Sequence, residues 1–119
     1  MLFRSGHLVF STLHTTDASK TIERIVGVFP LSDQHVIRTR FSKAFRYIVS
    51  QRLMPRKGGG RVAAIEILIS TLRTREYVEK GEQEGKTLVD AMQDGVLDGM
   101  QHFDLVIEQM IREIGRAHV

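Results

Sequence analysis

The sequence predicts an α/β protein, in which an incomplete sheet with flanking helices is followed by an all-helical C-terminal tail. Strand-like apolar runs alternate with helical periodicity as far as residue 69, and after Ser70 only short helical patterns remain. The 119 residues, with 42% hydrophobic and 26% charged side chains, are typical of one small globular domain.

The first predicted unit is a strand, a short turn and a helix. Residues 7–14 form a mostly apolar run without strict alternation, which favours a strand buried on both faces of a parallel sheet. Thr15, Thr16 and Asp17 are good helix N-cap types. A helix then extends to Pro30, with its apolar positions at Ala18, Ile22, Ile25, Val26 and Phe29.

A second helix and a strand pair follow. Ser32 or Asp33 is expected to cap the helix, whose apolar face would comprise Ile37, Phe41, Ala44, Phe45 and Ile48. The composition turns β-like over residues 47–54, and Pro55 ends that strand. Residues 57–61 are glycine-rich and are expected to form a hairpin loop to a strand over residues 62–69.

Three helices are predicted in the tail, over residues 71–80, 87–93 and 100–112. The last carries an apolar stripe of Phe103, Val106, Ile107, Met110 and Ile111, which we expect to cover the core or a neighbouring helix.

Composition excludes several classes of site. There is no cysteine, and the five histidines are widely spaced, so we predict no metal site. No apolar run approaches the length of a membrane span and no signal peptide is evident, which favours a cytoplasmic location.

The two ends of the chain differ from the rest. Residues 1–5 and 114–119 can be back-translated into a common sequencing-library adapter, and we interpret them as adapter translation. Arg4 and Arg116 lie in these segments, so most of the formal charge of +3 comes from them. Nucleic-acid binding through Arg38, Arg40, Lys43 and Arg46 would predict an affinity that falls steeply with salt. A solvated helix face is the better interpretation of these residues, and we expect no nucleic-acid partner.

Two histidines flank the first predicted strand. His14 would lie at its carboxyl end, where ligands bind in open α/β sheets, and could donate a hydrogen bond to a phosphate oxygen or simply cap or pack. His7 would lie roughly 23 Å away on the opposite face, so the two cannot share one phosphate. A structural role is favoured for His7, with a subunit contact as the alternative.

Residues 6–16, GHLVFSTLHTT, resemble the His box of the ring-forming P-loop ATPases of type IV pili and type II secretion. Further similarity covers nearly all of residues 6–113, through Ala18, Lys20, Thr21 and Ile22, and then Phe29-Pro30, Ser50–Leu53, Gly58–Ala64 and Gly99–Gln101. The pilus-retraction ATPases are the most similar branch.

This resemblance implies a partial RecA-like ATPase core with the His box over residues 6–70 and a helical C-terminal subdomain over residues 71–113. It also implies a homo-hexamer that binds ATP and Mg2+, with His14 near the terminal phosphate, Thr15 and Thr16 beside it, and a His-box role for His7. The implied task is pilus retraction (twitching motility) or a related secretion step. The implied partner is the inner-membrane platform protein, and the implied location is the cytoplasmic side of the inner membrane.

Two features limit these implications. The family's Walker A and Walker B motifs lie upstream of the matching region and are not in this chain, so we expect no nucleotide bound to it alone and no activity. Residues 73–80 depart from the helix of the retraction ATPases, with Arg75 as the main match, which leaves retraction open against extension or secretion. A non-catalytic docking or assembly module with the same fold is the alternative function.

One further motif is a decoy. Residues 81–87, GEQEGKT, resemble a P-loop, but they have one residue too few between the glycines and carry two carboxylates where phosphate would bind. We interpret them as a turn.

Overall fold

The computed structural model describes residues 11–13 and 15–114, with side chains to residue 112. The order of elements is α1 (Ala18–Gly27), α2 (Leu31–Ala44), β1 (Tyr47–Pro55), β2 (Arg61–Ile69), α3 (Leu72–Lys80), α4 (Leu88–Asp94), the 3-10 turn η1 (Val96–Asp98) and α5 (Phe103–Ile114). The chain is therefore α/β, as predicted.

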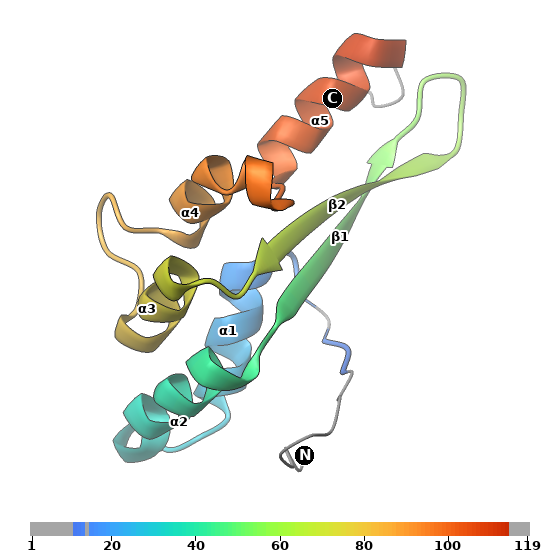
Figure 1. Ribbon diagram of the computed structural model, residues 1–119. Coiled ribbons are helices and arrows are strands. Elements are labelled where there is room, and N and C mark those ends of the chain that lie inside the picture. The colour runs from blue at the N-terminus through green and yellow to red at the C-terminus, as the bar shows by residue number, and fades with distance from the viewer. Residues whose placement is uncertain (1–10, 14, 115–119) are drawn as a thin grey trace.

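Strands β1 and β2 form an antiparallel hairpin that crosses the molecule (Figure 1). The register runs from Tyr47 opposite Ile69 to Pro55 opposite Arg61, so the two strands pair along their whole length. The loop between them contains Gly58, Gly59 and Gly60, all with positive φ, a conformation that glycine adopts without steric cost. The hairpin and its loop were predicted correctly.

Alternation along the hairpin separates two faces. Ile48 and Ser50 on β1 and Ala64, Glu66 and Leu68 on β2 are buried. On the opposite face of β1, Tyr47, Val49 and Leu53 are exposed. One face of the hairpin thus packs on the helices.

The core lies between that face and the helices. Its buried side chains come from α1, the C-cap of α2, β1, β2, α3, α4 and the turn before α5: Ala18, Ile22, Val26, Phe45, Ile48, Leu68, Val78, Leu88, Met92 and Met100. Helix α2 packs on α3. Its side chains Ile37 and Phe41 are partly buried against the core.

Helices α1, α3 and α4 each begin with a side-chain cap. Asp17, Thr71 and Thr87 accept hydrogen bonds from the backbone N–H groups of Lys20, Thr74 and Asp90. Thr71 and Thr87 also form reciprocal capping boxes.

Three expectations need correction. Residues 11–13 are exposed and not in a strand, while the rest of the expected strand over residues 7–14 lies outside the described residues. In the described part of the chain, the sheet holds only β1 and β2, so no parallel neighbour is present to accept such a strand. Helix α2 is not capped by Ser32 or Asp33: it begins directly after Pro30, whose fixed φ suits a helix start, and has no side-chain cap. Ile48 belongs to β1 and not to the face of α2.

The segment after β2 is mainly helical, but it is joined to the hairpin. Gln101 forms an antiparallel bridge with Ile67, with N–H···O distances of 2.8 and 3.2 Å. Helix α5 also packs against β2, and the division into residues 6–70 and 71–113 stays a prediction. Within the described residues, no helix is long and apolar enough to cross a membrane.

Candidate functional site: the turn before α1

Of the predicted site residues, the structure describes Thr15, Thr16 and Arg75. His7 and His14 fall outside the described residues. Thr15 and Thr16 lie in the turn before α1, whereas Arg75 is exposed on α3. Across residues 11–13 and 15–112, no group of three or more histidine or acidic side chains could hold a metal ion.

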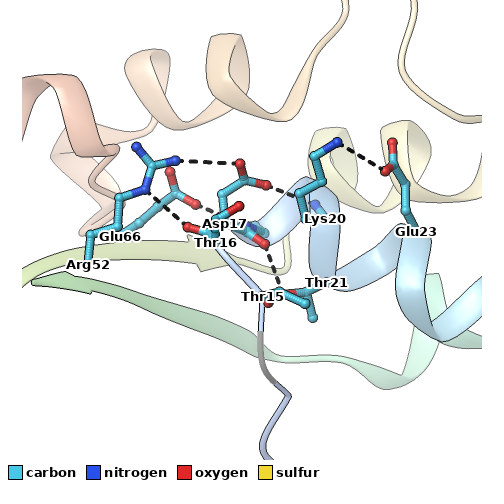
Figure 2. Close-up of polar contacts among 9 residues, drawn as sticks. Thr15, Thr16, Asp17, Lys20, Thr21, Glu23, Arg52 and Glu66 are labelled. Atoms are coloured by element: carbon cyan, nitrogen blue, oxygen red, sulfur yellow. Dashed lines mark hydrogen bonds and ion pairs between the residues drawn. The ribbon is translucent and has the colours of Figure 1, made fainter.

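The turn over residues 15–17 is held by its own side chains (Figure 2). The Thr15 hydroxyl lies 2.6 Å from that of Thr21, and the Thr21 hydroxyl donates to the Asp17 carbonyl at 2.9 Å. The Asp17 carboxylate accepts from the Lys20 N–H at 2.8 Å and so caps α1. The turn is therefore fixed onto the first turn of the helix.

Two side chains from the hairpin also reach this turn. Arg52 on β1 donates from Nε to the Thr16 carbonyl at 3.2 Å, and its terminal nitrogen lies 3.6 Å from the Asp17 carboxylate. Glu66 on β2 accepts from the Ala18 N–H at 3.1 Å. Because Ser50 faces Glu66 in the register, Arg52 and Glu66 are diagonal neighbours on the face that meets α1.

Glu66 is a buried acid, with only 3% of its surface exposed. Burial raises the pKa of its carboxyl group, and the nearby Asp17 charge raises it further. The backbone N–H groups of Ala18 and Phe103 and the Arg52 charge oppose this rise in pKa. The neutral form is therefore favoured over a wider pH range than for a free glutamate.

A pocket of about 140 Å³ adjoins these residues. Its lining includes Asp17, Arg52, Glu66, His102 and Phe103. The imidazole Nδ1 of His102 is buried and has no hydrogen-bond partner within the described residues. With Asp104, which also lines it, the pocket combines three acidic side chains, one arginine, an imidazole and an aromatic ring.

Acidic side chains of the protein already occupy two backbone N–H groups at the start of α1. The N–H group of Ala18 donates to the Glu66 carboxyl group, and that of Lys20 donates to the Asp17 carboxylate. A phosphate bound at a helix N-terminus would need these same N–H groups. The Thr15 hydroxyl is likewise engaged. A phosphate contact by Thr15 or Thr16 stays a prediction, and this geometry gives it no support.

Arg52, Glu66 and His102 were not predicted as site residues from the sequence. Glu66 had a signal, because it is the one charged residue in the apolar run 62–69, and a lone acid in a buried strand is seldom without a partner. Arg52 and His102 had none, since their positions in sequence do not indicate that they meet α1.

Residues 81–87 form a turn that is closed on itself. Gln83 and Lys86 pair with each other through their backbones, and Glu82 accepts the Leu88 N–H at 2.9 Å. Thr87 caps α4. Protein acceptors therefore occupy the N–H groups of Gln83, Lys86 and Leu88, and the segment forms a turn as expected.

Comparison with known proteins finds that this chain is similar to one part of several type IV pilus ATPases. It is 41% identical over 107 residues to the type IV pilus retraction ATPase PilT of Pseudomonas aeruginosa, 38% identical over 110 residues to a twitching motility protein of Neisseria gonorrhoeae, and 35% identical over 107 residues to the type IV pilus ATPase PilU of P. aeruginosa. These alignments include 89–92% of this chain. No family model matches.

Solved structures of ATPases show a similar fold. The crystal structure of the pilus retraction motor PilT with bound ADP superposes with a TM-score of 0.72 and 36% identity over 97% of this chain. The Legionella pneumophila ATPase DotB superposes with a TM-score of 0.64, and at 22% identity that likeness shows the fold alone. The chain is homologous to PilT-like pilus ATPases, and it spans about 30% of the length of these relatives.

Proposed function

We propose that this chain is a segment of a motor ATPase that powers type IV pilus retraction or a related secretion step. The observation that carries the proposal is 41% identity to PilT over 90% of the chain, together with a TM-score of 0.72 to the ADP-bound PilT structure. Walker A and Walker B motifs, and with them most of the ATP and Mg2+ site, would come from the remainder of the parent protein.

In this proposal the parent is a homo-hexamer in the cytoplasm, at the inner-membrane base of a pilus or secretion machine. Its partner would be the platform protein, and the exposed Arg75 on α3 would lie on a docking helix. His14 would contact the terminal phosphate, because it directly precedes the turn that Thr15–Asp17 fix onto α1. A contact of this kind matters most as charge redistributes in the transition state.

A chimera tests the proposal. Residues 6–113 would replace the matching segment of P. aeruginosa PilT, and Mg2+-dependent ATP hydrolysis would be measured with the hexamer verified by size. We expect turnover, and we expect His14→Ala to remove most of it while the ring still assembles. The matched control is His35→Ala, at an exposed position of α2, which should keep normal turnover.

Two outcomes would count against parts of this assignment. Normal turnover by an intact His14→Ala ring would exclude the phosphate contact. A chimera that assembles without hydrolysing ATP, although PilT itself is active in parallel, would favour the non-catalytic docking or assembly module.

A further inference from the structure

We propose that Arg52 is a positioning residue, which holds the Thr15–Asp17 turn in place by tying the start of α1 to the start of α5. The inference rests on the proposed function, because that turn directly follows His14. It assigns Arg52 no contact with nucleotide.

Arg52 links three parts of the fold: β1, which carries it, the turn before α1, and the start of α5. Its side chain rises from β1, Nε donates to the Thr16 carbonyl at 3.2 Å, and a terminal nitrogen lies 3.6 Å from the Asp17 carboxylate. On the other side, its guanidinium carbon lies 4.1 Å from the centre of the Phe103 ring, at the first residue of α5. Phe103 is buried, so the ring that supports the guanidinium is itself fixed.

The geometry requires arginine and not merely a positive charge. A guanidinium is planar, so it can stack on an aromatic ring while its edge donates hydrogen bonds, whereas an ammonium group is a point charge on a flexible stem. The ion pair with Asp17 adds little by itself, because both side chains are partly exposed, at 41% and 27%, and water screens the pair. The directional bond to Thr16 and the stacking on Phe103 therefore define the position of the turn.

Glu66 supports the same turn from the neighbouring strand. It holds the Ala18 N–H at 3.1 Å, one residue beyond the Asp17 carboxylate that Arg52 contacts. The backbone from Thr16 to Ala18 is thus held by both strands of the hairpin. A shift at the start of α5 would move Phe103, and through Arg52 it would move the turn.

The test uses the PilT chimera with Arg52→Lys, and Arg61→Lys as the matched control at an exposed position of β2. We expect Arg52→Lys to lower kcat by about tenfold or more with KM for ATP changed less than about twofold, because misplacing a catalytic group affects the transition state more than ground-state binding. Hydrogen exchange in peptides that cover residues 15–21 should become faster. Arg61→Lys should change neither quantity.

A double-mutant cycle tests the tie to α5. Phe103→Leu keeps an apolar side chain but removes the ring, so its effect on exchange and that of Arg52→Lys should be less than additive if the two act together. Additive effects, or an Arg52→Lys chimera with normal kcat and normal exchange, would overturn the proposal.

The two proposals can fail separately. If the unsubstituted chimera lacks ATPase activity, the proposed function fails. Hydrogen exchange of Arg52→Lys and Arg61→Lys, measured on residues 1–119, still tests whether Arg52 links the start of α1 to the start of α5. Equal exchange over residues 15–21 in both variants would refute it. Faster exchange in Arg52→Lys alone would support it.

Discussion

Replacing Glu66 tests the energetics of the buried carboxyl group. Glu66→Ala removes the acceptor of the Ala18 N–H, and Ala18 is fully buried, so this N–H loses its partner. Leaving a buried donor unsatisfied costs about 1–3 kcal/mol. Glu66→Gln keeps a carbonyl oxygen that can accept the same bond, so we expect it to cost less than Glu66→Ala.

The pH dependence of Glu66→Gln gives the second part of this prediction. Burial raises the folded-state pKa of Glu66 above its ordinary value of 4.5. Its contribution to stability is therefore fully present below about pH 4.5 and is lost as the pH rises through the folded-state pKa. Glutamine does not ionise, so the stability of Glu66→Gln relative to wild type should increase with pH across this window.

Urea denaturation of residues 1–119, followed by circular dichroism at several pH values from about 4 to 8, measures both effects. Asp17 and Arg52 are the same in wild type and variant, so the two proteins differ only at position 66. Equal losses of stability for alanine and glutamine, or a difference between glutamine and wild type that does not vary with pH, would refute the reasoning from burial.

Two further predictions concern α4 and the isolated chain. Thr87→Ala should lower the free energy of unfolding by about 1 kcal/mol, because it removes the side-chain acceptor of the Asp90 N–H. The control is Thr39→Ala inside α2, which should be nearly neutral. Equal urea midpoints for the two variants would contradict the role of the cap. Purified residues 1–119 should not release phosphate from Mg2+-ATP, because the backbone cradle, lysine and acidic ligands of a P-loop site are not in this chain. Turnover that is lost on Lys86→Ala would show that residues 81–87 were interpreted wrongly.

Features determined by neighbouring residues could be predicted from the sequence. Helix starts at Asp17, Thr71 and Thr87 are encoded in the cap itself, and the hairpin is encoded in two apolar runs around Gly58–Gly60. The start of α2 was missed because Ser32 and Asp33 are also good caps, and the choice of Pro30 depends on how the chain leaves α1. Local preference alone does not decide between such neighbours.

The cluster before α1 could not be predicted in this way. Thr16 and Arg52 are 36 residues apart in sequence, and Ala18 and Glu66 are 48 apart. These groups meet only because the hairpin turns one face toward α1, and the register that brings Arg52 beside Glu66 is a property of the paired strands. The residues that carry the resemblance to the ATPase family include Thr16, Ala18 and Arg52 but not Glu66, and the resemblance did not indicate which of them touch.

The caps of α1, α3 and α4 have a consequence for how such genes can vary. Each helix start is specified by residues within four positions of itself, so a stretch of coding sequence that is exchanged between related genes brings its own helix boundaries with it. Arg52, Glu66 and Phe103 are different, because a crossover between any two of them would unite partners that arose in separate lineages. Mosaic genes should therefore tolerate breakpoints after Phe103 more readily than between Thr16 and Phe103.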